Sequence, residues 1–276
     1  MTDRTLTLSN EEFQLLRQFV LRSIGVNLTE AKRSLVVSRL SKQVRKLGFS
    51  SFSEYLKLVK EDKQEKENMF NMITTNVTKF FREQHHFEYI TKDFLPQFAA
   101  SQDKVVRIWT SACSSGEEPY SIAMSLEKAL KSYRNLNYKL LASDINTEML
   151  QKAKLGIYRR EEVEGVPYDE LKSFFKMGQG DNEGLLKVKE SLQKKIVFQR
   201  INLVSDQQYP IKEKVHIIFC RNVFIYFSKD TQMQILKRFH EHLHQGGILI
   251  LGHSESIPLS QGGWRLIQKT IYEKTD

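Results

Sequence analysis

The feature that most constrains the fold is an alternation of short apolar runs with helical stretches after residue 103. Apolar runs of this length predict strands that are buried on both faces of a parallel sheet. The runs are VVRIWT (105–110), YKLLAS (138–143), KIVFQR (195–200), VHIIFC (215–220) and GILILG (247–252). The helical stretches between them lie at 116–132, 146–155 and 228–244. The pattern therefore predicts an α/β domain with a mostly parallel, Rossmann-like sheet.

Two segments depart from this alternation. The last one, WRLIQKTIYEKT, holds two strand-like pieces with no helix between them, which predicts a terminal antiparallel hairpin. Such an ending is typical of a class I methyltransferase domain. The stretch 173–198 contains three glycines and short strand-like pieces, and it predicts a small antiparallel β insertion. The alternative is a long surface loop.

The chain before residue 95 has a helical pattern. Ser9 or Asn10 is a candidate cap for a first helix. A second helix is predicted between Thr29 and Gly48, with an apolar stripe at helical spacing, and one or two more follow over 51–76. We therefore predict an all-helical N-terminal domain over 1–83, a linker helix over 84–103 and the α/β domain over 104–276.

Composition narrows the function class. Hydrophobic residues make up 40% and charged residues 27%, no window resembles a membrane span, and the first residues lack the apolar core of a signal peptide, so we expect a cytoplasmic protein without membrane insertion. Two cysteines and seven scattered histidines show no metal-ligand spacing, so we expect no metal. A net charge of +9 suits an acidic partner, which includes nucleic acid, an anionic membrane or an acidic protein.

The loop SACSSGEEPYS (111–121) joins the first predicted strand to a helix, where nucleotide-binding loops usually lie. It contains one glycine and two acids, Glu117 and Glu118, which disfavour a pyrophosphate, since like charges 4 Å apart cost about 4 kcal/mol at an effective dielectric constant of 20. S-adenosylmethionine carries a sulfonium and an amino group instead of phosphate. Asp144 ends the second strand, where it can accept hydrogen bonds from ribose hydroxyls. The alternative is that both acids complement the helix dipole.

Six segments occur in an order that resembles the chemotaxis receptor glutamate methyltransferases, the CheR family. They are TTNVTKFFRE (74–83), SACSSGEEPYSIA (111–123), ASDINTEMLQKAKLGIY (142–158), INL (201–203), IFCRNVFIYF (218–227) and GGILILGHSE (246–255). The resemblance extends from about residue 10 to 274. It implies transfer of a methyl group from S-adenosylmethionine to receptor glutamates, leaving S-adenosylhomocysteine.

The resemblance also implies roles for individual residues. Arg82 and Tyr226 would be catalytic, although a tyrosine in VFIYF is more often a core aromatic. The cofactor-binding residues would be Asn76, Thr78, Arg82, Glu118, Asp144, Asn202, Leu203, Arg221 and Asn222.

The partners implied by the resemblance are acidic chemotaxis receptors. We expect the protein to be a monomer. The basic helix around 30–47 would contact the receptor, and a face formed by Arg39, Lys42 and Lys46 is the candidate surface. The insertion 173–198 is a candidate site for a receptor's C-terminal peptide, with Lys187 and Lys189 as its basic residues.

Two other functions stay open. One is a nucleic-acid methyltransferase, which the charge favours but for which no base-binding motif is visible, and the other is a non-catalytic module that senses the cofactor or its product.

Overall fold

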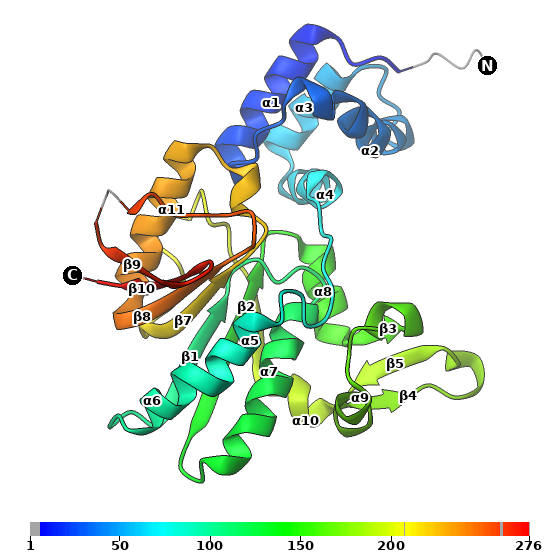
Figure 1. The fold of residues 1–276 in the computed structure, drawn as a ribbon. Helices are drawn as coiled ribbons and strands as arrows, with labels where there is room; N and C mark the ends of the chain where they lie inside the picture. Colours follow the sequence, from blue (N-terminus) through cyan, green and yellow to red (C-terminus); the bar gives the residue numbers. More distant parts are fainter. Residues whose placement is uncertain (1–5, 207, 260–261, 276) are drawn as a thin grey trace.

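A computed structural model describes residues 6–206, 208–259 and 262–275 of the chain. A helical N-terminal domain is joined through a linker helix to an α/β domain that carries a small β insertion (Figure 1). The class I methyltransferase fold predicted from the sequence is confirmed. None of the helices in the described part of the chain has the length and apolar character needed to cross a membrane.

The N-terminal domain contains four α-helices and one 3-10 turn. They are α1 (Asn10–Ile24), η1 (Glu30–Lys32), α2 (Arg33–Lys46), α3 (Phe52–Glu61) and α4 (Lys63–Ile73). Ser9 caps α1 in a reciprocal capping box with Glu12, and Ser51 and Asp62 cap α3 and α4, whereas η1 and α2 begin without a side-chain cap. In the apolar stripe predicted for α2, Val36, Leu40 and Val44 are fully buried in the core of this domain, whereas Leu47 after the end of the helix is exposed. The helices therefore begin and end largely where the capping residues predict.

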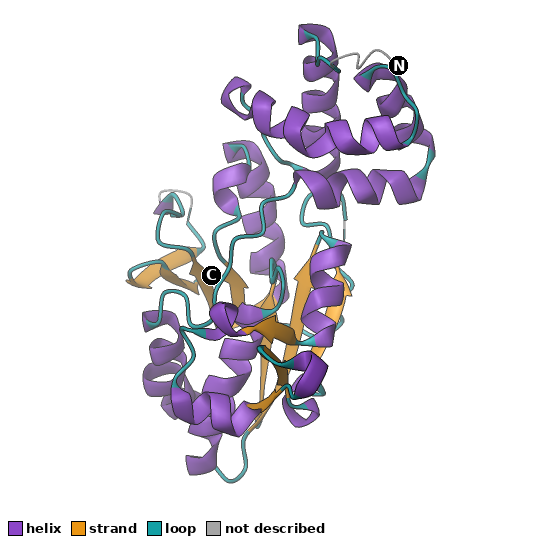
Figure 2. Ribbon diagram, turned by 90° about the vertical axis from the view of Figure 1, so that its right-hand side faces the viewer, coloured by secondary structure: helices purple, strands orange, loops and turns teal. Residues whose placement is uncertain are grey.

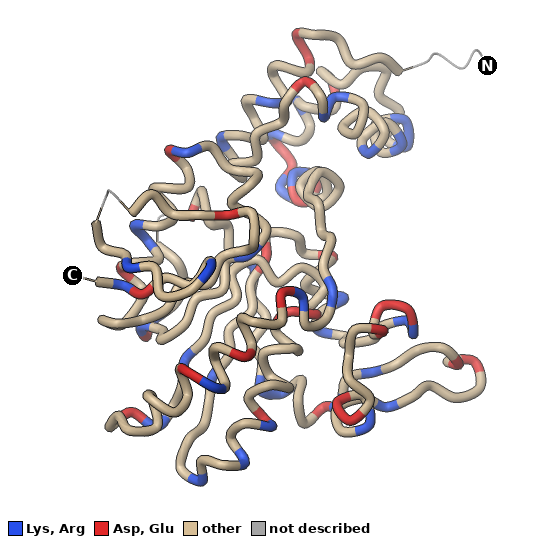
Figure 3. Tube along the Cα trace, viewed as in Figure 1, with Lys and Arg blue, Asp and Glu red and all other residues tan. Residues whose placement is uncertain are grey.

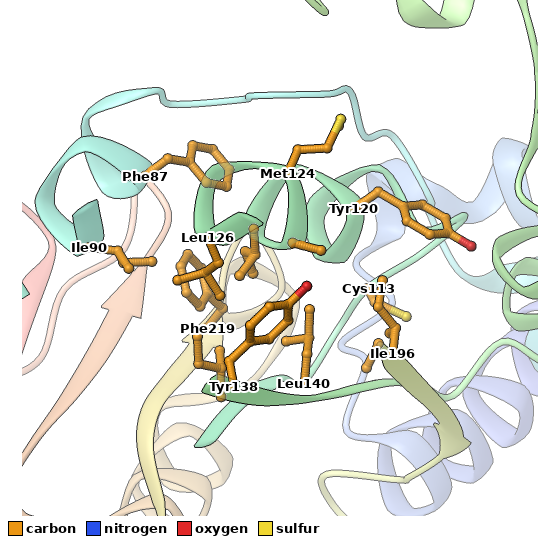
Figure 4. Packing of buried hydrophobic residues seen from close by; sticks show 14 of the residues in the cluster. Phe87, Ile90, Cys113, Tyr120, Met124, Leu126, Tyr138, Leu140, Ile196 and Phe219 are labelled. Carbon is orange, nitrogen blue, oxygen red and sulfur yellow. The ribbon is translucent and has the colours of Figure 1, made fainter. Parts of the chain in front are cut away.

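The linker helix is continuous over 85–99 and covers one face of the sheet. It consists of α5 (His85–Tyr89), a wider π turn η2 (Ile90–Phe94) and α6 (Leu95–Ala99). Phe87 and Ile90 pack against α7 (Glu117–Ala129), which continues into η3 (Leu130–Ser132) (Figure 4). The linker thus belongs to the core of the α/β domain.

The main sheet has seven strands in the order β6-β2-β1-β7-β8-β10-β9. The first five are parallel. The predicted hairpin follows, since β10 pairs antiparallel with β8 and β9 pairs antiparallel with β10. Their bounds are β1 (Val105–Thr110), β2 (Asn137–Asp144), β6 (Ile196–Arg200), β7 (Val215–Cys220), β8 (Leu243–Leu251), β9 (Trp264–Gln268) and β10 (Ile271–Lys274).

Alternate residues of the central strands enter cores on opposite faces of the sheet. Ile217 and Phe219 of β7 pack with the linker helix and α7, while Ile218 packs with α11 (Lys229–His242). Helices therefore cover both faces, as Figure 2 shows. A further helix, α8 (Thr147–Leu155), follows β2, and the short turn η6 (Phe224–Tyr226) follows β7.

The β insertion is a three-stranded antiparallel sheet in the order β3-β5-β4. Its elements are β3 (Ile157–Arg159), η4 (Arg160–Val163), α9 (Tyr168–Phe174), β4 (Phe175–Met177), η5 (Gly180–Asn182) and β5 (Leu185–Val188), followed by α10 (Glu190–Gln193). The predicted bounds of 173–198 were wrong. The sheet includes β3, and the segment from Ile196 belongs to the main sheet. Because β3 has three residues, it leaves no alternating pattern in the sequence.

Candidate active site

A pocket lies at the carboxyl ends of β1, β2 and β7, and its empty space amounts to about 1190 Å³ with the open solvent at its mouth included. This is the edge of a doubly wound sheet where ligands bind. All ten residues predicted from the sequence line it, namely Asn76, Thr78, Arg82, Glu118, Asp144, Asn202, Leu203, Arg221, Asn222 and Tyr226. Residues spread over 150 positions of the chain therefore converge on one site.

The segment between α1 and α2 forms one wall of this pocket, which the sequence did not predict. The residues that it contributes around the end of α1 and the start of α2 are Ile24, Val26, Leu28, Lys32 and Leu35. Gly25 ends α1 with a φ of 72°, and a Cβ atom there would lie 2.6 Å from a methyl carbon of Val204. Glycine at this position thus lets α1 approach the α/β domain closely.

Hydrogen bonds join this wall to the α/β domain at two places. The Asn27 N–H donates to the carbonyl of Tyr226 over 2.9 Å, and Val26 forms an isolated β-bridge with Phe227. On the other side, Asn71 of α4 exchanges hydrogen bonds with Thr147 at the start of α8. These contacts hold the pocket closed on the side of the helical domain.

The loop after β1 places Glu118 in the pocket and Glu117 away from it. Glu118 accepts hydrogen bonds from the Thr110 hydroxyl and, over 2.8 Å, from the Arg221 guanidinium. Glu117 does not line the pocket, and its buried carboxylate accepts from the Ser115 hydroxyl. The charge argument against a pyrophosphate counted both acids, but only Glu118 lines the pocket. Consecutive helical residues point about 100° apart, so only one of the two faces the site.

Asp144 is buried at the end of β2 and receives two backbone hydrogen bonds. Its Oδ2 accepts from the Ser114 N–H over 2.7 Å and its Oδ1 from the Asn146 N–H over 2.9 Å. Burial raises the pKa of Asp144, and these hydrogen bonds oppose that shift. Each carboxylate oxygen keeps a second lone pair, so the side chain can still accept from a ligand hydroxyl.

Arg221 occupies the centre of a buried charge cluster with Glu118 and Glu83. Its guanidinium lies 3.2 Å from the Glu83 carboxylate, and it also donates to the carbonyl of Arg82. Burial alone would raise the pKa of Glu83, but the charge of Arg221 and a backbone hydrogen bond from His253 hold it below the usual value. Glu83 was not predicted as a site residue, although it lies in the segment that carries Asn76 and Arg82.

Strained backbone is concentrated around this cluster. Among the described residues, five other than glycine have positive φ, and four of them lie in the segments that form the site: Phe81 (52°), Glu83 (60°), Ser114 (47°) and Asn222 (57°). Such conformations cost roughly 1–3 kcal/mol each and persist only where the surroundings enforce them. The strain marks this region as a candidate functional site.

Glu255, a second residue that the sequence did not predict, clamps the loop after β7. One carboxylate oxygen accepts from the Phe224 N–H over 2.7 Å, and the other accepts from Asn222 and Gly252 over 2.8 and 2.7 Å. Burial raises the pKa of Glu255, against the lowering effect of these backbone donors. A Cβ atom on Gly252 would lie 2.5 Å from the side-chain amide nitrogen of Asn222 and 2.8 Å from its backbone nitrogen, so glycine is required beside the clamp. This arrangement fixes the loop that carries Asn222 and Tyr226.

Asn202 and Leu203 contribute to the pocket wall in different ways. The Asn202 amide donates to the carbonyl of Ser23 over 2.7 Å and accepts from the Val204 N–H over 2.9 Å. Its side chain is thus engaged within the protein and ties α1 to the loop after β6. Leu203 supplies an apolar surface, and its carbonyl accepts from Tyr209 and Arg238.

The two predicted catalytic residues lie near the mouth of the pocket. Arg82 is about one-third exposed and donates to the carbonyl of Val77 over 3.0 Å. Tyr226 is half-buried, and the ammonium of Lys32 lies 4.9 Å from its ring centroid. Tyr226 is therefore not a core aromatic, since it lines the pocket.

Charges in the pocket are separated by depth. The acidic lining residues are Glu118 and Asp144, which are both buried. The basic lining residues are Lys32, Lys79, Arg82 and Arg221. Only Arg221 among these four is buried. The site therefore combines acidic groups inside with basic groups around its opening.

The basic face predicted on α2 is smaller than expected. Arg39 turns inward, and its guanidinium donates to the carbonyls of Ile73 and Thr74 over 2.7 and 3.0 Å. It thereby satisfies free carbonyls at the end of α4, where positive charge is favourable. Lys42, Arg45 and Lys46 remain exposed on α2, and Figure 3 shows this basic stretch in the helical domain.

Comparisons with known proteins match nearly the whole chain. Residues 76–272 match the family described as "CheR methyltransferase, SAM binding domain", and residues 11–74 match "CheR methyltransferase, all-alpha domain". The Chemotaxis protein methyltransferase of Escherichia coli is 39% identical over 99% of this chain and 93% of that protein. Chemotaxis protein methyltransferase 2 of Pseudomonas aeruginosa is 39% identical, with coverages of 96% and 93%. The protein of Borreliella burgdorferi is 35% identical, with coverages of 91% and 90%.

Proposed function

The chain belongs to the CheR methyltransferase family, and on this premise we propose that it is a protein-glutamate O-methyltransferase. It uses S-adenosylmethionine, and it acts in chemotaxis like its relatives. Its acceptors in this proposal are glutamate side chains on the cytoplasmic helices of chemotaxis receptors, which become methyl esters during sensory adaptation. The observation that carries the proposal is the pocket with acidic groups inside and a basic opening.

The residues of the pocket fit S-adenosylmethionine. The ion pair of Glu118 with Arg221 presents both charges and matches the amino and carboxylate groups of a methionine. Asp144 is placed at a strand end to accept from ribose hydroxyls. Leu203 and the backbone beside Asn202 offer a surface for adenine, and Asn76, Thr78 and Asn222 line the remaining wall. S-adenosylhomocysteine retains all these groups and is expected to bind as well.

Methyl transfer to a carboxylate requires that the two reacting groups are oriented and that water is excluded, and it requires no proton transfer. The cofactor supplies an electrophilic methyl group on a sulfonium, and a glutamate carboxylate is already ionised at neutral pH. Water would solvate both ions and oppose their reaction. The apolar wall formed by Ile24, Leu28 and Phe227 excludes water from the pocket, and Arg82 and Tyr226 at the mouth would orient the carboxylate.

A labelling experiment tests this function. The purified protein is incubated with S-adenosylmethionine that is tritiated on its methyl group and with membranes that contain chemoreceptors. We expect counts on the receptor that mild base releases as methanol, because carboxyl methyl esters are labile to base. Base-stable counts, or counts on added RNA, would contradict the proposal in favour of a different methyltransferase. The absence of any transfer would favour a sensing module.

We also propose that Lys42 and Lys46 on the exposed face of α2 attract the acidic receptor, whereas Arg39 has a structural role. Reversing both lysines to glutamate should lower receptor methylation at low salt and leave binding of S-adenosylhomocysteine unchanged. Reversal of the exposed Lys131, at the far end of α7 from the pocket, is the control. Methylation that ignores the α2 reversal would remove this surface from receptor binding.

The insertion is proposed as a second contact for a receptor's C-terminal peptide. Its strands β3 and β4 are edges, each paired with β5 on one side, so a peptide can add to the sheet as a further strand. Lys187 lies on β5, but the Lys189 ammonium donates to the carbonyls of Lys172 and Ser173. Calorimetric titration with a receptor tail peptide tests this contact, and no heat of binding would exclude it.

The organisation proposed for the chain is a helical domain over 1–83, a linker over 84–103 and the methyltransferase domain over 104–276, acting as a monomer in the cytoplasm. The contacts of Asn27 and Asn71 across the first boundary support a single functional unit. Expression of 84–276, which keeps the linker helix and removes the helical domain, should therefore give a protein that fails to bind S-adenosylhomocysteine. Sedimentation at micromolar concentration tests the monomer.

A further inference from the structure

We propose that Lys32, a residue of the helical domain, binds the carboxylate of the methyl acceptor beside Tyr226. This inference rests on the proposed function, since it names a group that selects an acidic acceptor at the same site. Lys32 ends η1 and precedes α2, and it lines the pocket together with the catalytic candidates of the α/β domain.

The position of the Lys32 ammonium is defined by Tyr226. The ammonium lies 4.9 Å from the centroid of the Tyr226 ring, a distance at which a cation is attracted to an aromatic face. The two backbones are held together, because the Asn27 N–H donates to the Tyr226 carbonyl over 2.9 Å and Leu28 is buried next to it. Lys32 is therefore presented to the pocket by a fixed segment of backbone.

Lys32 is also available for an acceptor, in contrast to the two arginines of the pocket. Arg221 is paired with Glu118 and Glu83, and Arg82 lies 3.8 Å from Glu83. Within the described parts of the chain, no carboxylate lies within 4.0 Å of the Lys32 ammonium, and the contact with Tyr226 leaves its three N–H donors free for a carboxylate. Lys79 lines the pocket too, but it is exposed.

The charges on acceptor and product suit this role. As the methyl group moves, a bond forms between the carboxylate oxygen and the methyl carbon, the bond from that carbon to sulfur breaks, and its electron pair stays on sulfur. The acceptor changes from an anion to a neutral ester, so the attraction of Lys32 is lost and product release is favoured. Because the negative charge already declines in the transition state, Lys32 should lower KM for the acceptor more than it raises kcat.

The test compares Lys32→Met, Lys32→Arg and the control Lys131→Met in steady-state methylation of an acidic receptor fragment. A lost charge-assisted hydrogen bond predicts that Lys32→Met raises KM for the fragment about 10- to 100-fold. The variant should keep the wild-type Kd for S-adenosylhomocysteine, and its KM should depend less on salt. Lys32→Arg should recover most of the loss, and Lys131→Met should match the wild type.

The outcomes separate this inference from the proposed function. If the wild-type protein gives no base-labile product, the proposed function itself is wrong. If the wild type is active and Lys32→Met keeps the wild-type KM and salt dependence, the role of Lys32 is excluded while the function stands. A parallel loss of S-adenosylhomocysteine binding in Lys32→Met would also exclude it, because the residue would then support the cofactor pocket instead of the acceptor.

Discussion

Replacing Glu255 by glutamine tests whether its carboxylate holds the loop that carries Asn222 and Tyr226. The change keeps the size of the side chain but replaces one acceptor oxygen by an NH2 group. In the wild type, one carboxylate oxygen accepts from the backbone N–H groups of Phe224 over 2.7 Å and Ile225 over 3.4 Å. The other accepts from those of Asn222 over 2.8 Å and Gly252 over 2.7 Å. In either orientation of the glutamine side chain, its NH2 group faces at least one backbone N–H group that now lacks an acceptor.

The magnitude follows from these contacts. A buried donor left without an acceptor costs about 1–3 kcal/mol, and loss of the charge weakens the hydrogen bonds that remain. We therefore expect the free energy of unfolding to fall by about 2–4 kcal/mol in Glu255→Gln. Turnover should fall about tenfold or more at a temperature where the variant is still folded, because Asn222 is held at a φ of 57° by the clamp.

Urea unfolding followed by circular dichroism measures the stability, and methyl transfer to a receptor fragment measures turnover. The exposed Glu241 on α11 provides the matched control, and Glu241→Gln should stay within about 0.5 kcal/mol of the wild type. If Glu255→Gln is as stable and as active as this control, the loop does not depend on the clamp, and the reasoning is refuted.

Three further predictions concern other parts of the site. Burial and the charge of Arg221 lower the pKa of His86 to about 2 from 6.5. Below pH 6.5 the imidazole is therefore protonated in the unfolded chain but stays neutral in the folded protein, so the free energy of unfolding falls as the pH falls. Urea unfolding should show that the wild type loses about 2 kcal/mol more than His86→Gln between pH 6.5 and 5, and equal losses would contradict this. Asp144→Asn sets an NH2 group against a backbone N–H and should weaken S-adenosylhomocysteine binding about tenfold or more by calorimetry, whereas an unchanged Kd would remove Asp144 from the cofactor site. Arg82→Ala should reduce kcat far more than affinity for S-adenosylhomocysteine, and unchanged methylation would exclude Arg82 from catalysis.

The main sheet could be predicted from the sequence because the central strands are buried on both faces toward their carboxyl ends and therefore contain short apolar runs. The members of the pocket could be predicted because strand ends meet at one edge of such a sheet. Neither inference needs the orientation of a side chain. The three-residue strand β3 was missed because its length gives no periodic signal.

Orientation explains the errors in the site. Glu117 and Glu118 are equivalent in the sequence, but only Glu118 faces the pocket. The spacing of Arg39 and Lys42 places both on one face of α2. The sequence does not show that the end of α4 lies opposite Arg39 and accepts its hydrogen bonds. Glu83 pairs with Arg221, and Glu255 accepts from Asn222 and Phe224, which are all distant from their partners along the chain. The available signal was that each ends a segment on which the resemblance rests, Glu83 in TTNVTKFFRE and Glu255 in GGILILGHSE.

The most direct measurement is a crystal structure of the protein with S-adenosylhomocysteine. The account predicts that the ligand lies in the pocket between the two domains, with its ribose hydroxyls on Asp144 and its amino acid end at Glu118 and Arg221. Density for the ligand at any other place, or a ribose turned away from Asp144, would contradict it.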